Sequence, residues 1–468
     1  MLRLFTPANA LNERRYVADV LLRNFLGLEL EVRQHDRNEV FLTNGGDQRL
    51  VLDDSFFSEL NEPLVREDKL PSIPLKSWRL TESGFDATLP GLDLPVLFGK
   101  PLTNGSYVAC GDKEIRLGVD ILGSAFFMLT RYEELVSSQR DSYDRVPARA
   151  SIAYRAGFLD RPIVNEYVEL LWQCLNRLWR GLVRRKREFR IILSHDVDQP
   201  FLLRKDGFTR VLRTMVGDTV KRKNLVQGLK RPAQWLRACI LGPEQDPAYT
   251  FEYIMDVAEE RGLRSAFYFI PSVSAGPPDY RYGIQDPDIQ RLISRIHTRG
   301  HELGYHASIE TYRDGALMQQ EMDLLRHGCE KAGVEQESMG SRQHYLRIAT
   351  PVTLRHLAAA RLAYDTSLAY ADHAGFRCGT CWEYPFYDLE RRMPLGIVER
   401  PLIVMECSVM DDQYMSLGCS EKALDLMLRL ARACRRVSGD FTLLWHNTRV
   451  VSMKERRLFE AVLKGICA

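Results

Sequence analysis

The stretch RIILSHDVD, residues 190–198, decides the fold of the second half of this 468-residue chain. A short apolar run that ends in polar residues is typical of a strand buried on both faces of a sheet. Further apolar runs follow it, SAFYFI (265–270), HELGYHA (301–307) and FTLLWHN (441–447), with segments of helical periodicity between them. Strands that alternate with helices predict βα units, and hence a parallel sheet or barrel.

The composition is that of an ordinary folded protein, with 45% hydrophobic and 27% charged residues and a net charge of 64 − 62 = +2. This excludes a disordered chain and gives no reason to expect nucleic acid as a partner. No apolar stretch approaches about 18 residues, and charges at 13–15 interrupt the N-terminal segment, so we predict neither a membrane span nor a signal peptide. Ten scattered cysteines fit reduced thiols, and we expect a cytoplasmic protein.

The first half has a mixed α and β pattern. Helical periodicity covers residues 15–27, 117–135 and 164–183, and short strands are expected within 29–51. The charged stretch WRGLVRRKREFR (179–190) separates this half from the next. We therefore predict an N-terminal α/β accessory domain at 1–187 and a second domain at 188–468. Nine of the ten histidines follow residue 190, which places the chemistry in the second domain.

Asp196 and Asp198 are the first candidates for that chemistry. Side chains two apart on a strand point the same way, so both carboxylates can face one site at the end of the strand. Such a pair suits one metal ligand and one general base. Acidic loops with the same spacing are common, so the pair alone is weak evidence.

Three further segments carry candidate groups. His306 and Glu310 could share one divalent ion if a helical turn begins at His306, whereas the alternative is that Glu310 simply starts a surface helix. In SRQHYLR (341–347), Arg342 could keep a catalytic carboxylate ionised, and Asp365 is a candidate partner for it. His446 ends the last apolar strand.

The order of these elements resembles the polysaccharide deacetylase superfamily, also called NodB-homology or carbohydrate esterase 4. The similarity is greatest to a bacterial branch with an extra N-terminal domain. The matching motifs are HDVD (195–198), GYH (304–306), RQHYLR (342–347), DTS (365–367) and GFRCGTC (375–381). This resemblance implies a distorted (β/α) barrel and a metal-dependent hydrolase that removes an N-acetyl group from an amino sugar.

The resemblance also implies a role for each motif residue. The catalytic residues would be Asp196 as general base, His446 as general acid, Arg342 to orient the base, Asp365 to hold that arginine, and the backbone N–H of Tyr345 to bind the oxyanion. The remaining roles would be Leu444 in the acetyl pocket, and Asp198 and His306 as metal ligands.

The sequence departs from the family at the third metal ligand. The second histidine of the family's H-(S/T)-x-x-H motif is replaced by Glu310, whereas His344 stands where the third motif usually has proline. Either side chain could complete a site for a divalent metal ion, expected to be Zn²⁺. We favour His344, because the similar branch carries the HYLR form together with the missing histidine. If neither serves, the chain is a catalytically inactive carbohydrate-binding or assembly protein.

The implied role lies in cell-surface polysaccharide biosynthesis. Without an export signal, we expect an N-acetylated sugar substrate linked to a nucleotide or a lipid at the inner membrane face. Deformylation is an alternative that keeps the chemistry. Residues 201–237 carry ten Lys/Arg against two Asp, which predicts either a solvated helical face or a peripheral contact with an anionic membrane surface.

Overall fold

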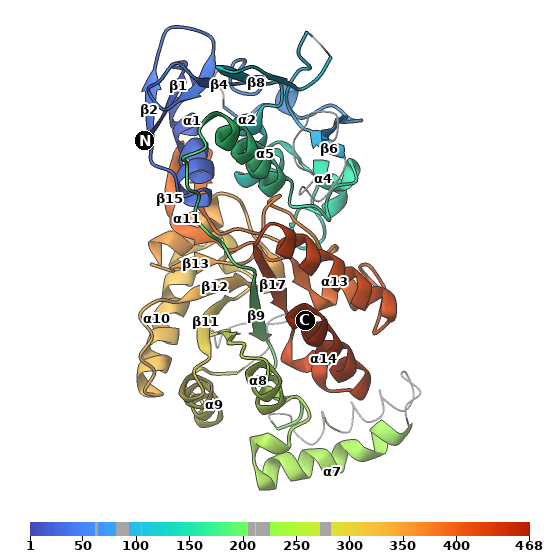
Figure 1. Cartoon of the computed structure of the whole chain (residues 1–468). Helices are drawn as coiled ribbons and strands as arrows, with labels where there is room; N and C mark the ends of the chain where they lie inside the picture. Colours follow the sequence, from blue (N-terminus) through green and yellow to red (C-terminus); the bar gives the residue numbers. More distant parts are fainter. Residues whose placement is uncertain (61–63, 81–92, 104, 205–210, 212–224, 272–281) are drawn as a thin grey trace.

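The strand predicted at 190–198 is β9 (Arg190–Val197), an interior strand of the larger sheet between β10 and β17 (Figure 1). The computed structural model describes the whole chain except residues 61–63, 81–92, 104, 205–210, 212–224 and 272–281. Nine of the described strands form this sheet in the order β14-β15-β13-β12-β11-β10-β9-β17-β16. The other members are β10 (Ser265–Phe269), β11 (Glu302–Ala307), β12 (Gly340–Gln343), β13 (Tyr364–Asp365), β14 (Tyr384–Asp388), β15 (Met393–Glu399), β16 (Val404–Met405) and β17 (Asp440–Leu444).

All neighbouring strands of this sheet pair in parallel, except β14 and β15, which are antiparallel. Every residue of β10 and β17 is buried, which explains their continuous apolar sequences. The helices of this part are α7 (Leu225–Leu241), α8 (Phe251–Glu259), α9 (Pro287–Thr298), α10 (Gly315–Lys331), α11 (Val352–Ala359), α12 (Glu406–Met410), α13 (Glu421–Arg436) and α14 (Met453–Cys467). The predicted α/β class is confirmed, with a curled sheet whose edge strands are β14 and β16.

The amphipathic α13 shows how the sequence produces these helices. Its buried residues recur at helical spacing, from Ala423 through Leu426 and Leu430 to Cys434. The Ser420 hydroxyl accepts a hydrogen bond from the Ala423 N–H and caps the first turn. The apolar stripe then packs toward the sheet while the charged face stays in water.

The first 180 residues form a second, six-stranded sheet in the order β2-β1-β3-β4-β8-β7, with a separate hairpin of β5 and β6. Its strands are β1 (Leu2–Thr6), β2 (Leu30–Gln34), β3 (Val40–Thr43), β4 (Arg49–Leu52), β5 (Lys76–Arg79), β6 (Asp93–Val96), β7 (Val108–Cys110) and β8 (Glu114–Leu117). Its helices are α1 (Leu11–Ala18), which continues as a π-helix to Phe25, α2 (Ile121–Leu129), α3 (Tyr132–Val136), α4 (Ile152–Arg155) and α5 (Ile163–Leu178). Each predicted helical stretch of this half therefore contains helix.

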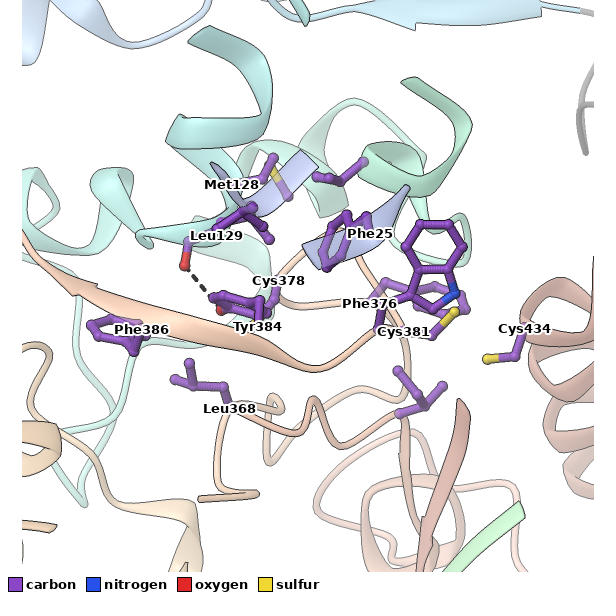
Figure 2. Close-up of a cluster of buried hydrophobic side chains, with 14 of the residues drawn as sticks. Phe25, Met128, Leu129, Leu368, Phe376, Cys378, Cys381, Tyr384, Phe386 and Cys434 are labelled. Carbon is purple, nitrogen blue, oxygen red and sulfur yellow. Dashed lines mark hydrogen bonds between the residues drawn. The ribbon is translucent and has the colours of Figure 1, made fainter. Parts of the chain in front are cut away.

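The two parts of the chain share one hydrophobic core (Figure 2). The Tyr384 hydroxyl of β14 donates to the Leu129 carbonyl of α2 at 2.9 Å. Nearby, the buried Arg377 guanidinium pairs with the Glu134 carboxylate at 2.7 Å. The motif GFRCGTC (375–381) thus lies at this junction. No helix or strand covers 182–189, but the division at 187/188 stays a prediction.

Within the described residues, no helix is long and apolar enough to cross a membrane.

Candidate metal and catalytic site

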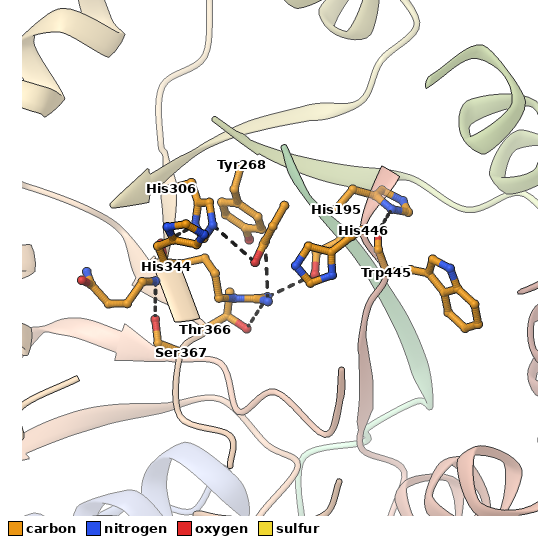
Figure 3. A network of polar contacts seen from close by, with 12 residues as sticks. His195, Tyr268, His306, His344, Thr366, Ser367, Trp445 and His446 are labelled. Atoms are coloured by element: carbon orange, nitrogen blue, oxygen red, sulfur yellow. Dashed lines mark hydrogen bonds and ion pairs between the residues drawn. The ribbon is translucent and has the colours of Figure 1, made fainter. Parts of the chain in front are cut away.

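Parallel strands bring three side chains of metal-ligating types together at the carboxyl ends of the strands. Asp198 follows β9, His306 lies in β11 and His344 follows β12. The Asp198 Oδ1 atom is 3.0 Å from His306 Nε2 and 3.6 Å from His344 Nε2. One ligand atom of each residue lies within 4.8 Å of the others, and Figure 3 shows the two imidazoles side by side.

The orientation of His306 fits a metal ligand. Its Nδ1 is 2.8 Å from the Arg342 carbonyl oxygen, which can only accept, so Nδ1 carries the proton and donates. The Nε2 lone pair then faces the Asp198 carboxylate at 3.0 Å. Two acceptors this close are stabilised by a cation or proton between them, and a second hydrogen bond that fixes the ring is typical of metal-bound histidine.

The charge of Asp198 fits the same role. Burial by itself would raise the pKa of this carboxyl. The imidazoles of His344 and His446 overcome that effect and hold the pKa of Asp198 well below its usual value. One carboxylate oxygen and two imidazole nitrogens form a donor set that suits Zn²⁺, with a fourth position open.

Glu310 does not join this cluster, so the helical-turn prediction is wrong. Its side chain is 72% exposed and lies 3.3 Å from the Arg347 guanidinium. The reason is local: β11 continues through Ala307, so His306 and Glu310 are not on successive turns of one helix. Of the two candidates for the third ligand, the structure places His344 beside Asp198.

The predicted general base, Asp196, lies on the same side of β9 as Asp198. It is buried, and its Oδ1 is 3.7 Å from Nη1 of the fully buried Arg342. That arginine is held from the other side by the Ser194 and Thr366 hydroxyls, at 3.1 and 3.3 Å from Nη2. Among the described residues, neither Asp196 Oδ1 nor Arg342 Nη1 has a hydrogen-bond partner, and the two atoms lie next to each other.

Asp365 does not pair directly with Arg342, contrary to the prediction. Its carboxylate accepts from Ser341 Oγ at 2.8 Å and from the backbone N–H and hydroxyl of Ser367 at 2.9 Å. The register explains this, because Asp365 stands opposite Ser341 on β12 and shares its face. Arg342, one residue further, points to the other face.

His446 reaches the site from the opposite side, as Figure 3 shows. Its Nε2 is 3.6 Å from Asp198 Oδ2, and its Nδ1 is 2.7 Å from Glu406 Oε1. Burial alone would lower the pKa of this imidazole, but Glu406 and the adjacent Cys407 raise it well above its ordinary value. His446 is therefore a protonated, oriented group, the condition that a general acid requires.

Glu406 is a functional residue that the sequence motifs did not predict. It is fully buried at the start of α12, directly after β16, and its Oε1 also accepts the backbone N–H of His446 at 2.9 Å. The run LIVMEC (402–407) ends an apolar strand in an acid, as the stretch at 190–198 does. That pattern was the available signal.

The turn after β12 carries Tyr345, which has a left-handed backbone with φ 60° and ψ 13°. Together with Asp196, Asp198, His344 and His446, it lines a cavity of about 240 Å³. Leu444 is fully buried in a small apolar cluster, and its neighbours Leu346 and Met405 form part of the cavity wall. Leu444 thus supports the wall from behind.

His195 lies on the other face of β9 from Asp196. Its Nδ1 donates to the Trp445 carbonyl at 2.6 Å, and burial lowers the pKa of the ring to about 3. A neutral, buried imidazole of this kind stabilises the fold and takes no part in the site.

Comparisons with known proteins give one family match and several similar solved structures. Residues 2–180 match a family of unknown function, DUF7033. No curated protein matches. Solved structures similar to this chain include a protein from Mycobacterium smegmatis provisionally described as a polysaccharide deacetylase, with 16% identity over 61% of this chain and 85% of that one and a TM-score of 0.38.

Two other solved structures show similar coverage. A polysaccharide deacetylase from Bacillus cereus is 9% identical over 60% of this chain and 87% of its own, with a TM-score of 0.28. PuuE allantoinase is 10% identical over 61% and 85%, with a TM-score of 0.36. Polysaccharide deacetylases are thus among the solved structures to which this chain is similar, as the motifs predict.

Proposed function

We propose that this protein is a metal-dependent hydrolase that removes an N-acetyl group from an amino sugar, on a distorted (β/α) barrel of the NodB-homology type. The observation that carries the proposal is the arrangement of three groups around one cavity. The candidate ligands Asp198, His306 and His344 lie between a buried base, Asp196, and a protonated histidine, His446.

A divalent ion held by Asp198, His306 and His344, expected to be Zn²⁺, would supply a Lewis acid and lower the pKa of a water molecule. Asp196 accepts the proton of the attacking water, and the Arg342 guanidinium lies beside this carboxylate, with Nη1 3.7 Å from Oδ1.

The other groups act on the substrate. The Tyr345 backbone N–H donates to the carbonyl oxygen of the acetyl group as negative charge develops on it. His446, held by Glu406, donates its proton to the departing sugar amine, which is otherwise a poor leaving group.

The alternative of an inactive carbohydrate-binding or assembly protein rested on the missing family histidine. The position of His344 supports the enzyme instead, because its Nε2 lies 3.6 Å from Asp198 Oδ1, where it could serve as the third ligand. The structure therefore favours the enzyme over the binding protein.

For the wider role, we propose cell-surface polysaccharide biosynthesis at the cytoplasmic face of the membrane, on a nucleotide- or lipid-linked N-acetylated sugar. Nucleic acid is not among the expected partners. Much of the basic segment 201–237 lies outside the described residues, but α7 (Leu225–Leu241) begins within it and continues past its end. The side chains of Leu236, Ile240 and Leu241 on this helix are 52%, 69% and 61% exposed, which supports a contact with an anionic membrane surface.

The test is the release of acetate from N-acetylated nucleotide sugars and oligosaccharides by the purified, zinc-loaded protein, with formamide analogues screened in parallel. Asp196→Asn should bind zinc as the wild type does but lose activity by about 100-fold or more. Zinc binding without release of acetate or formate from any substrate would favour the binding protein. Equal activity in wild type and Asp196→Asn would contradict the assigned base.

A further inference from the structure

The turn that carries His344 and Tyr345 adopts an unfavourable backbone. Tyr345 has φ 60° and the next residue, Leu346, has φ 54°, so two successive non-glycine residues lie in the left-handed region. L-residues avoid this region, and a branched side chain such as leucine has no local hydrogen bond to offset the cost. Contacts from outside the turn must therefore hold it in place.

Arg145, from the first part of the chain, supplies such a contact. Its Nη1 donates to the Tyr345 carbonyl oxygen at 2.8 Å, and its Nη2 donates to the Tyr414 hydroxyl at 3.3 Å. The Tyr143 ring stacks on the Tyr345 ring, with centroids 4.7 Å apart and planes at 17°. The backbone and the side chain of Tyr345 are thus both held by the segment 141–145.

That segment is itself held by internal hydrogen bonds. The Asp141 carboxylate accepts the backbone N–H groups of Tyr143 and Arg145 at 2.9 and 3.0 Å, and it pairs with the Arg145 guanidinium at 2.7 Å. The side chain of Arg145 is only 7% exposed. Its guanidinium can leave the Tyr345 carbonyl only by breaking this loop.

The same segment is tied to the chain that follows β11. The Asp144 carboxylate accepts from the Tyr312 hydroxyl at 2.9 Å and lies 3.1 Å from the Arg313 guanidinium. On the other side of the turn, Arg347 pairs with Glu310 and donates to the Tyr312 hydroxyl at 3.0 Å. The turn is therefore contacted on both sides, by Arg145 and by the segment around Tyr312.

We propose that Asp141–Arg145 is a positioning element of the candidate site, supplied by the part of the chain that matches the family of unknown function. It holds the carbonyl oxygen and the ring of Tyr345 in place and, through the same turn, the His344 imidazole toward Asp198. Arg145 also lines the cavity, so the site is complete only with the first 180 residues present. This inference rests on the proposed function of the site.

The test compares Arg145→Gln with the wild-type full-length protein. We expect its affinity for Zn²⁺, measured by competition with a chelator, to fall about tenfold or more, because residues that orient ligands affect affinity on this scale. With an N-acetylated sugar that the wild type deacetylates, kcat should fall by about 10- to 100-fold while KM changes less than about twofold. Arg145→Lys, which keeps the charge but not the forked geometry, should recover only part of each loss.

Two further variants complete the design. Arg149→Gln changes an exposed arginine of the same region and should match the wild type in both measurements. Tyr143→Ala removes the stacked ring at a partly exposed position, so it tests the element even if Arg145→Gln fails to fold. The zinc affinity of Tyr143→Ala should lie between that of Arg149→Gln, which is higher, and that of Arg145→Gln, which is lower.

Wild-type zinc affinity and kcat in a folded Arg145→Gln, or in Tyr143→Ala should that variant alone fold, would overturn the inference. A wild type that binds zinc but releases no acetate contradicts the proposed function instead, and the zinc affinities still decide the role of the segment.

Discussion

The carboxylate of Glu406 lies 2.7 Å from Nδ1 of His446, and both side chains are held at the ends of neighbouring strands. The carboxylate is fully buried, and nearby charges hold its pKa below the usual value. It is therefore an anion in a place of low dielectric, where its effect on the imidazole is strong. The pair makes His446 a proton donor whose Nε2 lies 3.6 Å from the candidate metal ligand Asp198.

Replacing this anion should change the pH dependence of the reaction. Glu406 raises the pKa of His446, so Glu406→Gln lowers it, and the protonated acid is then lost at a lower pH. We expect the alkaline limb of the kcat profile to move to lower pH and kcat at pH 8 to fall about tenfold or more. As a control, Glu310→Gln, at an exposed carboxylate, should leave the alkaline limb unchanged. If the limb is also unchanged in Glu406→Gln, Glu406 does not set the pKa of His446.

The buried pair of Glu134 and Arg377 should make stability depend on acid pH. Burial alone would raise the pKa of Glu134, but Arg377 and Arg131 lower it from 4.5 to about 2. A carboxyl whose pKa is lower in the folded state stabilises the protein above its unfolded pKa, and that contribution disappears as the pH falls from about 4.5 to about 2.

The free energy of unfolding in urea, measured between pH 6 and pH 3, tests this relation. The wild type should lose more stability over the range than Glu134→Gln, which has no proton to take up at this position. At pH 7, Glu134→Gln should be less stable by about 3 kcal/mol or more, because it leaves buried arginines without their anion. If wild type and Glu134→Gln lose the same free energy of unfolding between pH 6 and pH 3, the stabilising role of the Glu134 carboxylate is contradicted.

The exposed apolar side chains of α7 should contribute to binding of anionic vesicles. Leu236 and Ile240 are four residues apart and share one face of the helix. We expect Leu236→Ser/Ile240→Ser to reduce co-sedimentation with phosphatidylserine vesicles about tenfold, since each change removes apolar side-chain area that would be buried in the bilayer on binding. Leu324→Ser, at an exposed leucine of α10, is the matched control, and equal binding by all three proteins would exclude α7 as the contact.

The sequence predicted those features that depend on local periodicity. The two-residue period of a strand correctly set Asp196 and Asp198 on one side and His195 on the other. The prediction for Glu310 failed because it used helical spacing from His306, whereas His306 lies in the extended strand β11.

Other features depend on pairing between distant segments, which periodicity does not determine. Asp365 was assigned to Arg342, but the register of β12 and β13 sets it opposite Ser341. Likewise, Glu406 is 40 residues from His446 and Arg145 is 200 residues from Tyr345, so no local pattern pairs them.

The most direct test of the central claim is the metal content of purified wild type beside Asp198→Ala, His306→Ala, His344→Ala and Glu310→Ala. The account predicts about one divalent ion per chain in the wild type and in Glu310→Ala, and its loss from each of the other three. Folded wild-type protein without metal would contradict the hydrolase. Metal that is kept by His344→Ala and lost from Glu310→Ala would contradict the ligand set.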